Sequence, residues 1–431
     1  MEGFDLDEFQ KYVHTKCEAL GDVSNLGIYA NYFHQHIFFQ EVKSQYFSDT
    51  APVRDSKVLA IFILIVAIFL GAGIVFFALV RGCLGRRSFH ASVDSSETAG
   101  VATCNGSLER LRSYLLKYSK ESSIVYMDVL AKKSNRFIEK GVTVRHIIDV
   151  ISFREIFFAL AISPIFYSYF YRNFRSVLLI SAKYYVSYKF CCYSGIRLVQ
   201  DAVNASLIHA YLQKYSVKNV VAGTTNERYG TYLQEICNVL SIDTVCIPHG
   251  VSPCLKLPNG IFGNSYMCLT SREREYLEAI YGPGRFIYDH QVINELYQRK
   301  EVFNSRFTES IVYATCSRDV KGDQRVMDKL IEYDFRFVIK LHPNDSLSNY
   351  RLPPARRKVV SIDEALCSTR LITKLSAITI DASENGSQVF VVIDSVCDLI
   401  DYRCLYFGAV HPSAKVVYSV DELVGFLGTD V

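Results

Sequence analysis

The sequence has no long block of basic residues, and it lacks the fingerprints of several common enzyme classes. Its formal net charge of +3 over 431 residues gives no support for nucleic acid as the main partner. Neither a Walker phosphate loop nor a G-x-G-x-x-G dinucleotide fingerprint occurs in it. These absences argue against a nucleic-acid-binding protein, a P-loop ATPase and a nicotinamide-dependent dehydrogenase.

The cysteines form no pattern typical of a metal site or a disulfide framework. There are 13, and none belongs to a C-x-x-C pair or to a Cys/His zinc spacing. An odd and scattered set, which includes the adjacent Cys191 and Cys192, is typical of free thiols in a reducing compartment. We therefore expect neither a bound metal nor a cofactor.

The sequence does contain a large apolar fraction. Half of its residues are hydrophobic, and the chain is long enough for two or three domains with cores of their own. The longest apolar run, Val58 to Val80, has 23 residues and no charge. At about 1.5 Å per residue, such a helix would cross the roughly 30 Å hydrocarbon layer of a bilayer. The run predicts one transmembrane helix over residues 58–80, with a buried core helix as the alternative.

The charges beside this run predict its orientation. Basic residues are denser after it than before it, at Arg81, Arg86 and Arg87. The positive-inside tendency then places the large C-terminal part in the cytoplasm, and the run begins too late for a signal peptide. Four Asn-x-Ser matches keep a lumenal orientation open, at Asn105, Asn204, Asn344 and Asn385.

The segments around the run differ in character. Residues 1–57 form an N-terminal arm with apolar and aromatic patches. Residues 81–107 become rich in Ser, Ala, Gly and Thr without any period, which predicts a flexible tether.

A second apolar stretch, Ile156 to Tyr171, is short for a membrane span and has Pro164 at its centre. Arg154 and Arg172 bracket it. This pattern suits either a segment in the membrane interface, close to a lipid-linked acceptor, or a core helix.

Alternating strand and helix patterns predict a first Rossmann-like α/β domain over residues 108–285. Asn219 to Ala222 reads as a strand, and the helix after it keeps apolar residues at 3.6-residue spacing. Glu227 falls in the first turn of that helix, where its carboxylate would accept a proton or only complement the helix dipole. The next strand ends in Pro-His-Gly, which places His249 at its carboxyl end, as a second candidate base or a structural histidine.

A second Rossmann-like domain is predicted over residues 286–431. Its first strand is followed by Ser317 and Arg318, where a strand meets its helix and a nucleotide phosphate would bind. Two later strands also end in polar loops, one at His342 and one at Ser376. Because ligands bind outside the carboxyl ends of parallel strands, we expect His342 and Ser376 to meet at one bound anion, from adjacent strand ends.

The spacing of these residues resembles a pattern found in a known family of enzymes. Ser376, Asp381, Gly386 and Val389 follow a Ser-x4-acidic-Ala-x3-Gly-x-x-Val pattern that resembles the donor domain of GT-B glycosyltransferases. With His342-Pro343 upstream, the pattern is similar to that of bacterial surface-polysaccharide transferases with an HP motif and a Ser motif. That group includes polysialyltransferases, Kdo transferases and CDP-glycerol glycerophosphotransferases.

The resemblance implies two Rossmann-like domains and a cytidine-nucleotide donor. It implies that the HP histidine and the Ser motif, here His342, Pro343, Ser376 and Asp381, bind the donor phosphate. The favoured prediction is a membrane-anchored transferase that moves a sugar from a CMP-sugar, of sialic acid or Kdo type, to a glycan or lipid-linked acceptor. The only Asp-x-Asp pair, at residues 5 and 7, precedes the apolar run, so we expect the reaction to need no metal.

Two alternatives stay open. The first keeps the fold and transfers a polyol phosphate from a CDP-alcohol. The second is a non-catalytic membrane-anchored binding protein. It is prompted by Ala377, which stands where a second Ser or Thr is usual, and by Gln388, which stands where Pro is usual.

Overall fold

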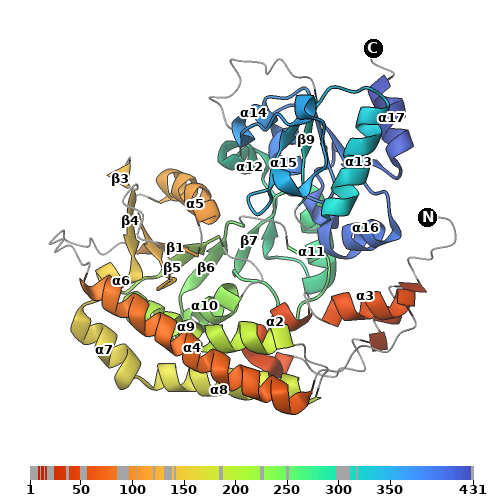
Figure 1. Ribbon diagram of the computed structural model, residues 1–431. Helices are drawn as coiled ribbons and strands as arrows, with labels where there is room; N and C mark the ends of the chain where they lie inside the picture. The colour runs from red at the N-terminus through yellow and green to blue at the C-terminus, as the bar shows by residue number, and fades with distance from the viewer. Residues whose placement is uncertain are drawn as a thin grey trace. The chain divides into compact units, whose positions relative to one another are not determined.

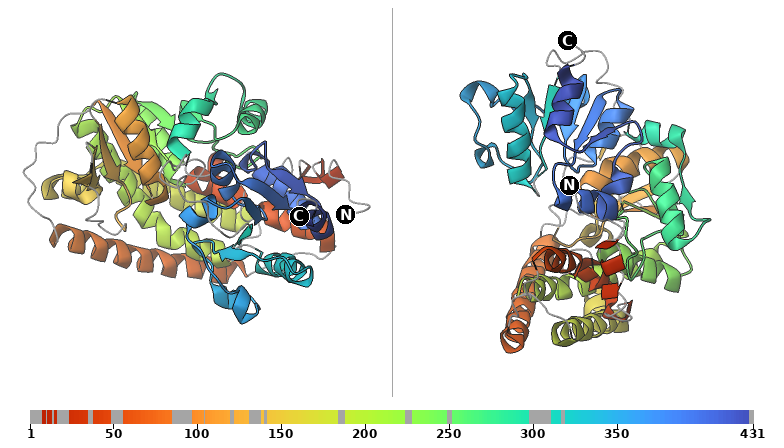
Figure 2. Two further views of the ribbon diagram at one scale, coloured as in Figure 1. Left: turned by 90° about the horizontal axis from the view of Figure 1, so that it is seen from above. Right: turned by 90° about the vertical axis from the view of Figure 1, so that its right-hand side faces the viewer.

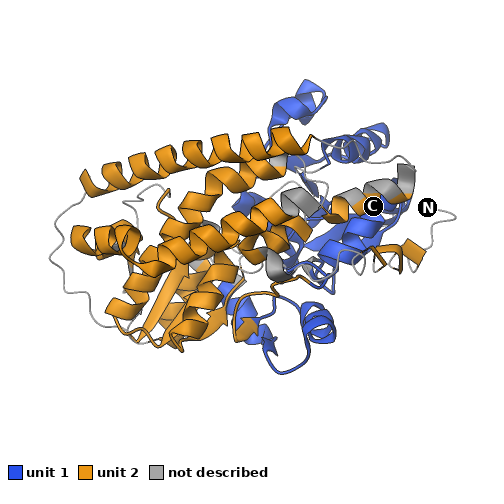
Figure 3. Cartoon of the chain, turned by 90° about the horizontal axis from the view of Figure 1, so that it is seen from below, with its two compact units in different colours: residues 1–6, 250–256, 267–431 blue, residues 7–249, 257–266 orange. Residues whose placement is uncertain are grey.

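A computed structural model of the chain shows a mixed α/β protein (Figure 1). The structure describes residues 8–9, 11–13, 15–16, 24–34, 38–48, 56–84, 97–103, 105–119, 122–130, 138–139, 142–183, 188–223, 228–248, 252–297, 311–316 and 319–428. The chain divides into two compact units (Figure 3). Unit 1 comprises residues 1–6, 250–256 and 267–431, and unit 2 comprises residues 7–249 and 257–266.

The larger sheet has eight strands in the order β3-β4-β2-β1-β5-β6-β7-β8. Its strands are β1 (Thr98–Ala102), β2 (Ser122–Tyr126), β3 (Ile138–Glu139), β4 (Val142–His146), β5 (Asn219–Ala222), β6 (Asp243–Cys246), β7 (Ser265–Met267) and β8 (Phe286–Ile287). The strands from β4 to β7 pair in parallel, and β3 pairs antiparallel to β4. The chain builds outward from β1 to β2 and β4, then returns to β5 on the other side of β1, which makes a doubly wound sheet.

The position of β1 corrects one prediction. Residues 81–107 were expected to form a flexible tether, but Thr98–Ala102 is a central strand paired with β2 on one side and β5 on the other. Small residues form it because the sheet is crowded there. A Cβ on Gly100 would lie 2.7 Å from Leu115 and 2.9 Å from Ile124. Tertiary packing therefore overrides the loop-like composition.

Helix α9 is the central helix of unit 2. The helices α4, α7, α8 and α10 all pack against it. The helices of this unit are η1 (Ser24–Tyr29), α2 (Ala30–Phe33), α3 (Phe39–Ser48), α4 (Lys57–Leu84), α5 (Asn105–Tyr118), α6 (Ile147–Val150), α7 (Phe153–Ala161), α8 (Pro164–Lys183), α9 (Tyr188–Lys214) and α10 (Arg228–Val239). Figure 2 shows α4 from two further directions.

The predicted membrane helix exists as a helix. Among the described residues, α4 alone is long and apolar enough to cross a membrane, and an 18-residue window of it has a mean hydropathy of 3.2. It is not bare on all sides, because one stripe of mostly small residues is buried: Ala60, Leu64, Ala67, Gly71, Val75 and Gly82. The second apolar stretch forms two helices, α7 and α8, and Pro164 begins the second of them, where its missing N–H costs nothing.

The sheet of unit 1 has five parallel strands in the order β10-β9-β11-β12-β13. Its strands are β9 (Ile311–Ala314), β10 (Val338–Lys340), β11 (Arg370–Thr373), β12 (Gln388–Val392) and β13 (Lys415–Val417). Its helices are α11 (Ser271–Tyr281), α12 (His290–Tyr297), α13 (Val320–Glu332), η4 (Leu347–Asn349), η5 (Pro354–Arg356), α14 (Ile362–Leu366), α15 (Ile378–Glu384), α16 (Val396–Asp401), η6 (Tyr402–Tyr406), η7 (Phe407–Ala409) and α17 (Val420–Gly428).

Each face of this five-stranded sheet has its own hydrophobic core. On one face α13 and α17 pack through Leu330 and Leu423. On the other, α14 and α15 pack through Leu366 and Ala382. Covered on both faces, the strands are continuous apolar runs, as expected for a parallel sheet. The prediction of a Rossmann-like α/β half is confirmed.

Local sequence signals mark the ends of two helices in this unit. Helix α14 begins with a capping box, because Ser361 accepts from the Glu364 N–H and the Glu364 carboxylate accepts from the Ser361 N–H. Helix α15 ends at Glu384, and Gly386 follows it with a φ of +85°, a conformation that glycine adopts without strain.

Candidate functional site

The candidate site in unit 1 is the carboxyl edge of its sheet. The chain runs from β9 to β10 on one side and then returns to β11 on the other side of β9, so the loops after β9 and β11 flank the point where the order reverses. Ligands of doubly wound sheets bind at this point. Thr315 and Cys316 follow β9, Ser376 follows β11 after a short loop, and His342 follows β10 one strand further along.

One detail of the prediction was wrong. His342 and Ser376 were expected on adjacent strand ends, but β9 lies between β10 and β11. The physical reason is the doubly wound topology, in which the first strand of the unit takes the central position and its two successors flank it. Ser317 and Arg318, in the loop after β9, lie outside the described residues.

Hydrogen bonds connect the three loops at this edge. The Thr315 hydroxyl accepts from the His342 N–H (3.0 Å) and donates to the Asp345 carboxylate (2.7 Å), which ties the loop after β10 to the loop after β9. The Cys316 thiol donates to the Leu375 carbonyl (3.6 Å), which ties the loop after β9 to the loop after β11. The three loops therefore form one hydrogen-bonded structure.

A hydrogen bond from a nearby backbone N–H determines the tautomer of the neutral His342 imidazole. Its Nδ1 accepts a hydrogen bond from the Asn344 N–H at 3.2 Å. A neutral imidazole with Nδ1 as acceptor carries its proton on Nε2. The following residue, Pro343, is exposed and restricts the backbone on both sides of its peptide bond.

Ser376 and Asp381 lie at the start of α15. The Ser376 hydroxyl accepts from the Ile378 N–H at 3.4 Å, and Ala377 at the N-cap makes no side-chain cap. Burial lowers the pKa of Lys340 at the end of β10, and the nearby Asp381 carboxylate offsets part of this effect.

A buried lysine stabilises the same edge, and the sequence pattern did not predict it. Lys374 is 1% exposed, and its Nζ lies 2.6 Å from Asp319, 2.9 Å from Asp394 and 2.9 Å from Asp398. Burial alone would lower its pKa, but the hydrogen bond to Asp319 and the other two carboxylates raise it. Burial would raise the pKa of Asp394, but its hydrogen bonds with Asp398 and Lys374 hold this pKa down, at about 2.

This ionic cluster fixes the start of α13. Asp319 is the N-cap of α13 and accepts from the Gly322 N–H at 2.9 Å. Lys374 at the end of β11 therefore holds the start of α13, while Asp394 anchors it to the end of β12. A lysine directly after an apolar strand was the available signal in the sequence, but its acidic partners are spread over 80 residues.

A second buried carboxylate lies beneath the loop after β9. Asp323 accepts hydrogen bonds from the Cys316 N–H (2.7 Å), the Tyr313 hydroxyl (2.8 Å) and the Tyr350 hydroxyl (3.2 Å). Burial raises its pKa to about 7, and these hydrogen bonds limit the rise. The Asp323 carboxylate therefore orders the loop after β9 and titrates near neutral pH.

In unit 2, the corresponding edge lies at the ends of β1 and β5, where the strand order reverses. Gly223 follows β5 and packs so close to Ser107 that a Cβ there would lie 2.4 Å from the serine Cβ. The Arg110 guanidinium donates to the Pro248 carbonyl at 3.3 Å. The two predicted catalytic residues, Glu227 and His249, lie outside the described residues.

A buried polar network borders this edge, and sequence reasoning did not find it. Arg228, the first residue of α10, donates to Asp201 of α9 (2.7 Å) and to the Tyr229 hydroxyl (2.6 Å). Tyr29 of η1 donates to the same Asp201 carboxylate at 2.8 Å, and Tyr229 donates to Asp128 at 2.8 Å. Burial raises the pKa of Asp201, and the Arg228 guanidinium opposes this rise. The network fixes the residue that follows Glu227.

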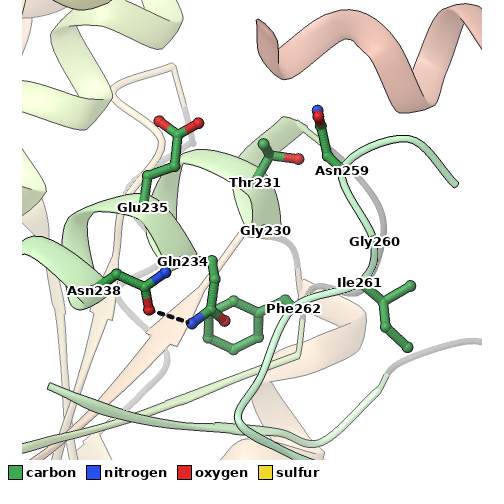
Figure 4. Close-up of a pocket in the computed structure, with 9 residues that line it drawn as sticks. All are labelled: Gly230, Thr231, Gln234, Glu235, Asn238, Asn259, Gly260, Ile261 and Phe262. Atoms are coloured by element: carbon green, nitrogen blue, oxygen red, sulfur yellow. Dashed lines mark hydrogen bonds between the residues drawn. The ribbon is translucent and has the colours of Figure 1, made fainter. Parts of the chain in front are cut away.

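A pocket of about 200 Å³ lies elsewhere in unit 2, between α10 and residues 259–262 (Figure 4). Its polar side chains serve the fold. Gln234 donates to Asn238 (2.9 Å) and accepts from the Gly263 N–H (2.8 Å), and Glu235 accepts from Tyr169 and Arg172. Of the described residues that line it, none belongs to the ends of β1 and β5 and none is a predicted site residue. Within the described part of the chain, no group of three or more His, Cys, Asp or Glu could hold a metal ion.

Comparison with known proteins gives likeness in fold alone. No protein-family model matches the chain, and no curated protein matches its sequence. Among solved structures, the chain is similar to UDP-GlcNAc 2-epimerase from Methanocaldococcus jannaschii (TM-score 0.41, 13% identity, 77% of this chain and 91% of that chain). It is also similar to the E. coli heptosyltransferase WaaC with ADP (TM-score 0.36, 8% identity, 78% and 100%). A third is the wall teichoic acid polymerase TagF (TM-score 0.40, 12% identity, 78% and 80%). The function that we propose therefore rests on the residues of the site.

Proposed function

We propose that the protein is a GT-B-type glycosyltransferase that moves a sugar from a nucleotide-activated donor to a glycan or lipid-linked acceptor. The observation that supports this most is the hydrogen-bonded structure at the carboxyl edge of unit 1, where Thr315 joins the His342 loop to β9 and Cys316 joins β9 to the Ser376 loop. Such an edge, at the reversal of strand order, is the usual nucleotide site of this topology.

In this proposal, His342 and Ser376 bind the donor phosphate. The Nε2–H that follows from the Asn344 contact donates to a phosphate oxygen, and the Ser376 hydroxyl adds a second donor. Ser317 and Arg318, which directly precede Asp319 in the sequence, are proposed to complete the site. Charge that develops on the leaving phosphate is then met by donors oriented beforehand. By resemblance, a CMP-sugar is the favoured donor.

Unit 2 provides the acceptor side. Glu227 is the proposed base that takes the proton of the attacking hydroxyl, and His249 is the alternative. The support is positional, because both residues follow the carboxyl ends of parallel strands. Arg228, locked by Asp201, fixes the start of the helix immediately after Glu227.

The test is a thermal-shift panel of CMP, CDP, UDP and GDP on the full chain. A ligand that binds only the folded protein adds about 2.7 kcal/mol of stability at a hundred times its dissociation constant. His342→Ala should remove most of the gain from the best ligand. His290→Gln, at an exposed histidine of α12 in the same unit, should keep it. A panel without any shift, or equal binding by His342→Ala, would contradict the phosphate assignment.

Turnover separates the proposed reaction from its alternatives. With cytidine donors labelled in the sugar or alcohol and in each phosphate, a glycosyltransferase passes only the sugar label to the acceptor. Phosphate label in the product would instead identify a polyol-phosphate transferase. Binding without turnover of any donor would identify a non-catalytic nucleotide-binding protein.

A further inference from the structure

Helix α4 is apolar on every side, but only one side is covered by protein. Its buried stripe packs against α9, and the opposite side exposes large side chains over the whole length of the helix. Phe69, Phe76 and Phe77 are 73%, 70% and 69% exposed. A single-sided contact of this kind leaves a long apolar surface in contact with whatever surrounds the protein.

Two further helices extend this surface. Helices α7 and α8 also pack on α9, and they too expose aromatic and aliphatic side chains. The exposed members are Phe153, Phe157 and Phe158 on α7, and Tyr167, Tyr171 and Leu179 on α8. We call the exposed apolar side chains of α4, α7 and α8 the apolar face. Figure 1 shows these three helices on the same side of unit 2.

The contact between α4 and α9 is too close and too long for α4 to cross a bilayer alone. A Cβ on Gly71 would lie 2.2 Å from the Ile196 carbonyl oxygen, and one on Gly195 would lie 2.6 Å from Ala67, so the two backbones touch. At its far end, α4 meets α6, where a Cβ on Gly82 would lie 2.7 Å from Ile148. The contacts hold α4 to the unit from Ala60 to Gly82.

The helix beneath α4 cannot enter lipid with it. Helix α9 carries the buried Asp201, which pairs with Arg228, and Gln200, which donates to Asp128. Its other side packs toward the sheet, as the bond between Tyr211 and Ser123 in β2 shows. A spanning α4 would have to draw these charged groups into hydrocarbon or give up its contacts with α9, and both are costly.

We propose that α4 lies flat in a membrane surface and that the apolar face enters one leaflet of a lipid bilayer. The charges on these helices fit an anionic lipid surface. Lys57 and Arg81 lie near the two ends of α4, and Arg154 and Arg175 are exposed on α7 and α8. The three helices contain a single acidic residue, Glu155, which is paired with Lys214. Basic residues beside an apolar helix face are typical of interfacial helices.

The absence of tryptophan from the sequence allows a direct test. Single tryptophans are introduced at exposed positions of the full chain, as Val58→Trp, Phe69→Trp and Leu84→Trp. Each variant is bound to vesicles of phosphatidylcholine and phosphatidylglycerol whose acyl chains are brominated either near the headgroup or near the bilayer centre. Tyr333→Trp, at an exposed position of unit 1, is the control.

A flat helix predicts the same depth at all three positions. Bromine near the headgroup should quench each of them more than bromine at the bilayer centre, and the control should not be quenched. A spanning helix would instead place the middle position, Phe69→Trp, at the bilayer centre and the two ends near opposite headgroups, which would overturn the proposal. Absence of quenching at all three positions would overturn it as well and would assign the apolar face to a protein partner or a second copy.

The contribution of the basic residues to vesicle binding can be measured separately. Arg154→Glu with Arg175→Glu should weaken binding to vesicles that contain phosphatidylglycerol several-fold and leave binding to pure phosphatidylcholine vesicles unchanged. Lys321→Glu, at an exposed lysine of α13, is the matched reversal outside the apolar face. An equal loss in both lipid mixtures would contradict the role of the basic residues.

Discussion

Lys374 shows how one side chain can hold a loop edge together. Its ammonium group is removed from water and is compensated by Asp319, Asp394 and Asp398, which come from three different segments of unit 1. The buried ammonium group is stabilised only while the carboxylates around it are charged. Each buried carboxylate in turn depends on the charge of the ammonium group.

We expect Lys374→Ala to destabilise unit 1 by about 3–5 kcal/mol, because it removes the cation beside the buried Asp398 and leaves Asp394 only its partly exposed partner Arg325. Urea unfolding followed by circular dichroism measures this. Lys321→Ala, at an exposed lysine of α13, should stay within about 0.5 kcal/mol of the natural protein. Equal stability of the two variants would mean that the cluster is solvated.

Asp323 predicts a pH dependence of stability. Its pKa is raised to about 7 in the folded protein, against an ordinary value of 3.8. Between these values the folded state binds one more proton than the unfolded state, so stability falls as the pH rises from 4 to 7 and then levels off. Chemical unfolding between pH 4 and pH 8 should show this fall in the natural protein relative to Asp323→Asn. A difference between the two that is independent of pH would contradict the raised pKa.

At the residue scale, the sequence was informative where a side chain stands at the end of a strand. His342 and Ser376 could be placed at strand ends because apolar runs, Pro343 and Gly386 are local signals. Lys374 was not recognised because its role depends on carboxylates that only the folded topology brings together. Arg228 directly follows the candidate Glu227 in the sequence, but its partner Asp201 lies in a different helix, so the pair could not be predicted.

At the scale of elements, helix α4 and helix α9 are joined through glycine. Gly71→Ala places a methyl group against the α9 backbone and should cost about 1–3 kcal/mol through overpacking. Gly73→Ala, two residues along on the exposed side, meets nothing within 4 Å and should stabilise the helix, by up to about 1 kcal/mol. Thermal unfolding in detergent compares the two. Equal effects would contradict the close backbone contact.

The elements also show what a sequence pattern can and cannot predict. Between Val58 and Val80 every residue of α4 is apolar, so periodicity does not reveal which side is buried. The small residues Ala60, Ala67 and Gly71 lie on the buried side. In β1 the residues are small and loop-like, and the strand exists because β2 and β5 flank it. The helices that alternate with strands were predicted better, because an amphipathic helix carries its own periodicity.

At the scale of the whole molecule, each compact unit has a sheet and a buried ionic group of its own. Arg228→Ala should leave Asp201 uncompensated and destabilise unit 2 by about 3–5 kcal/mol. Hydrogen exchange should then rise in β5 for this variant and in β9 for Lys374→Ala, because stability is distributed over separate cooperative regions. A rise in both strands for either variant would show that the two units unfold together.

The packing of α4 on α9 also has a consequence for biosynthesis. The ribosome completes α4 at Leu84, but α9 begins only at Tyr188. At roughly 5–20 residues per second, α4 waits for about 5–20 seconds before the first residues of its partner helix exist. During that interval the stripe of small residues that later packs against α9 is exposed, like the phenylalanines on the opposite side of α4. We therefore expect a chaperone or a targeting factor to bind the nascent α4 before the fold can protect it.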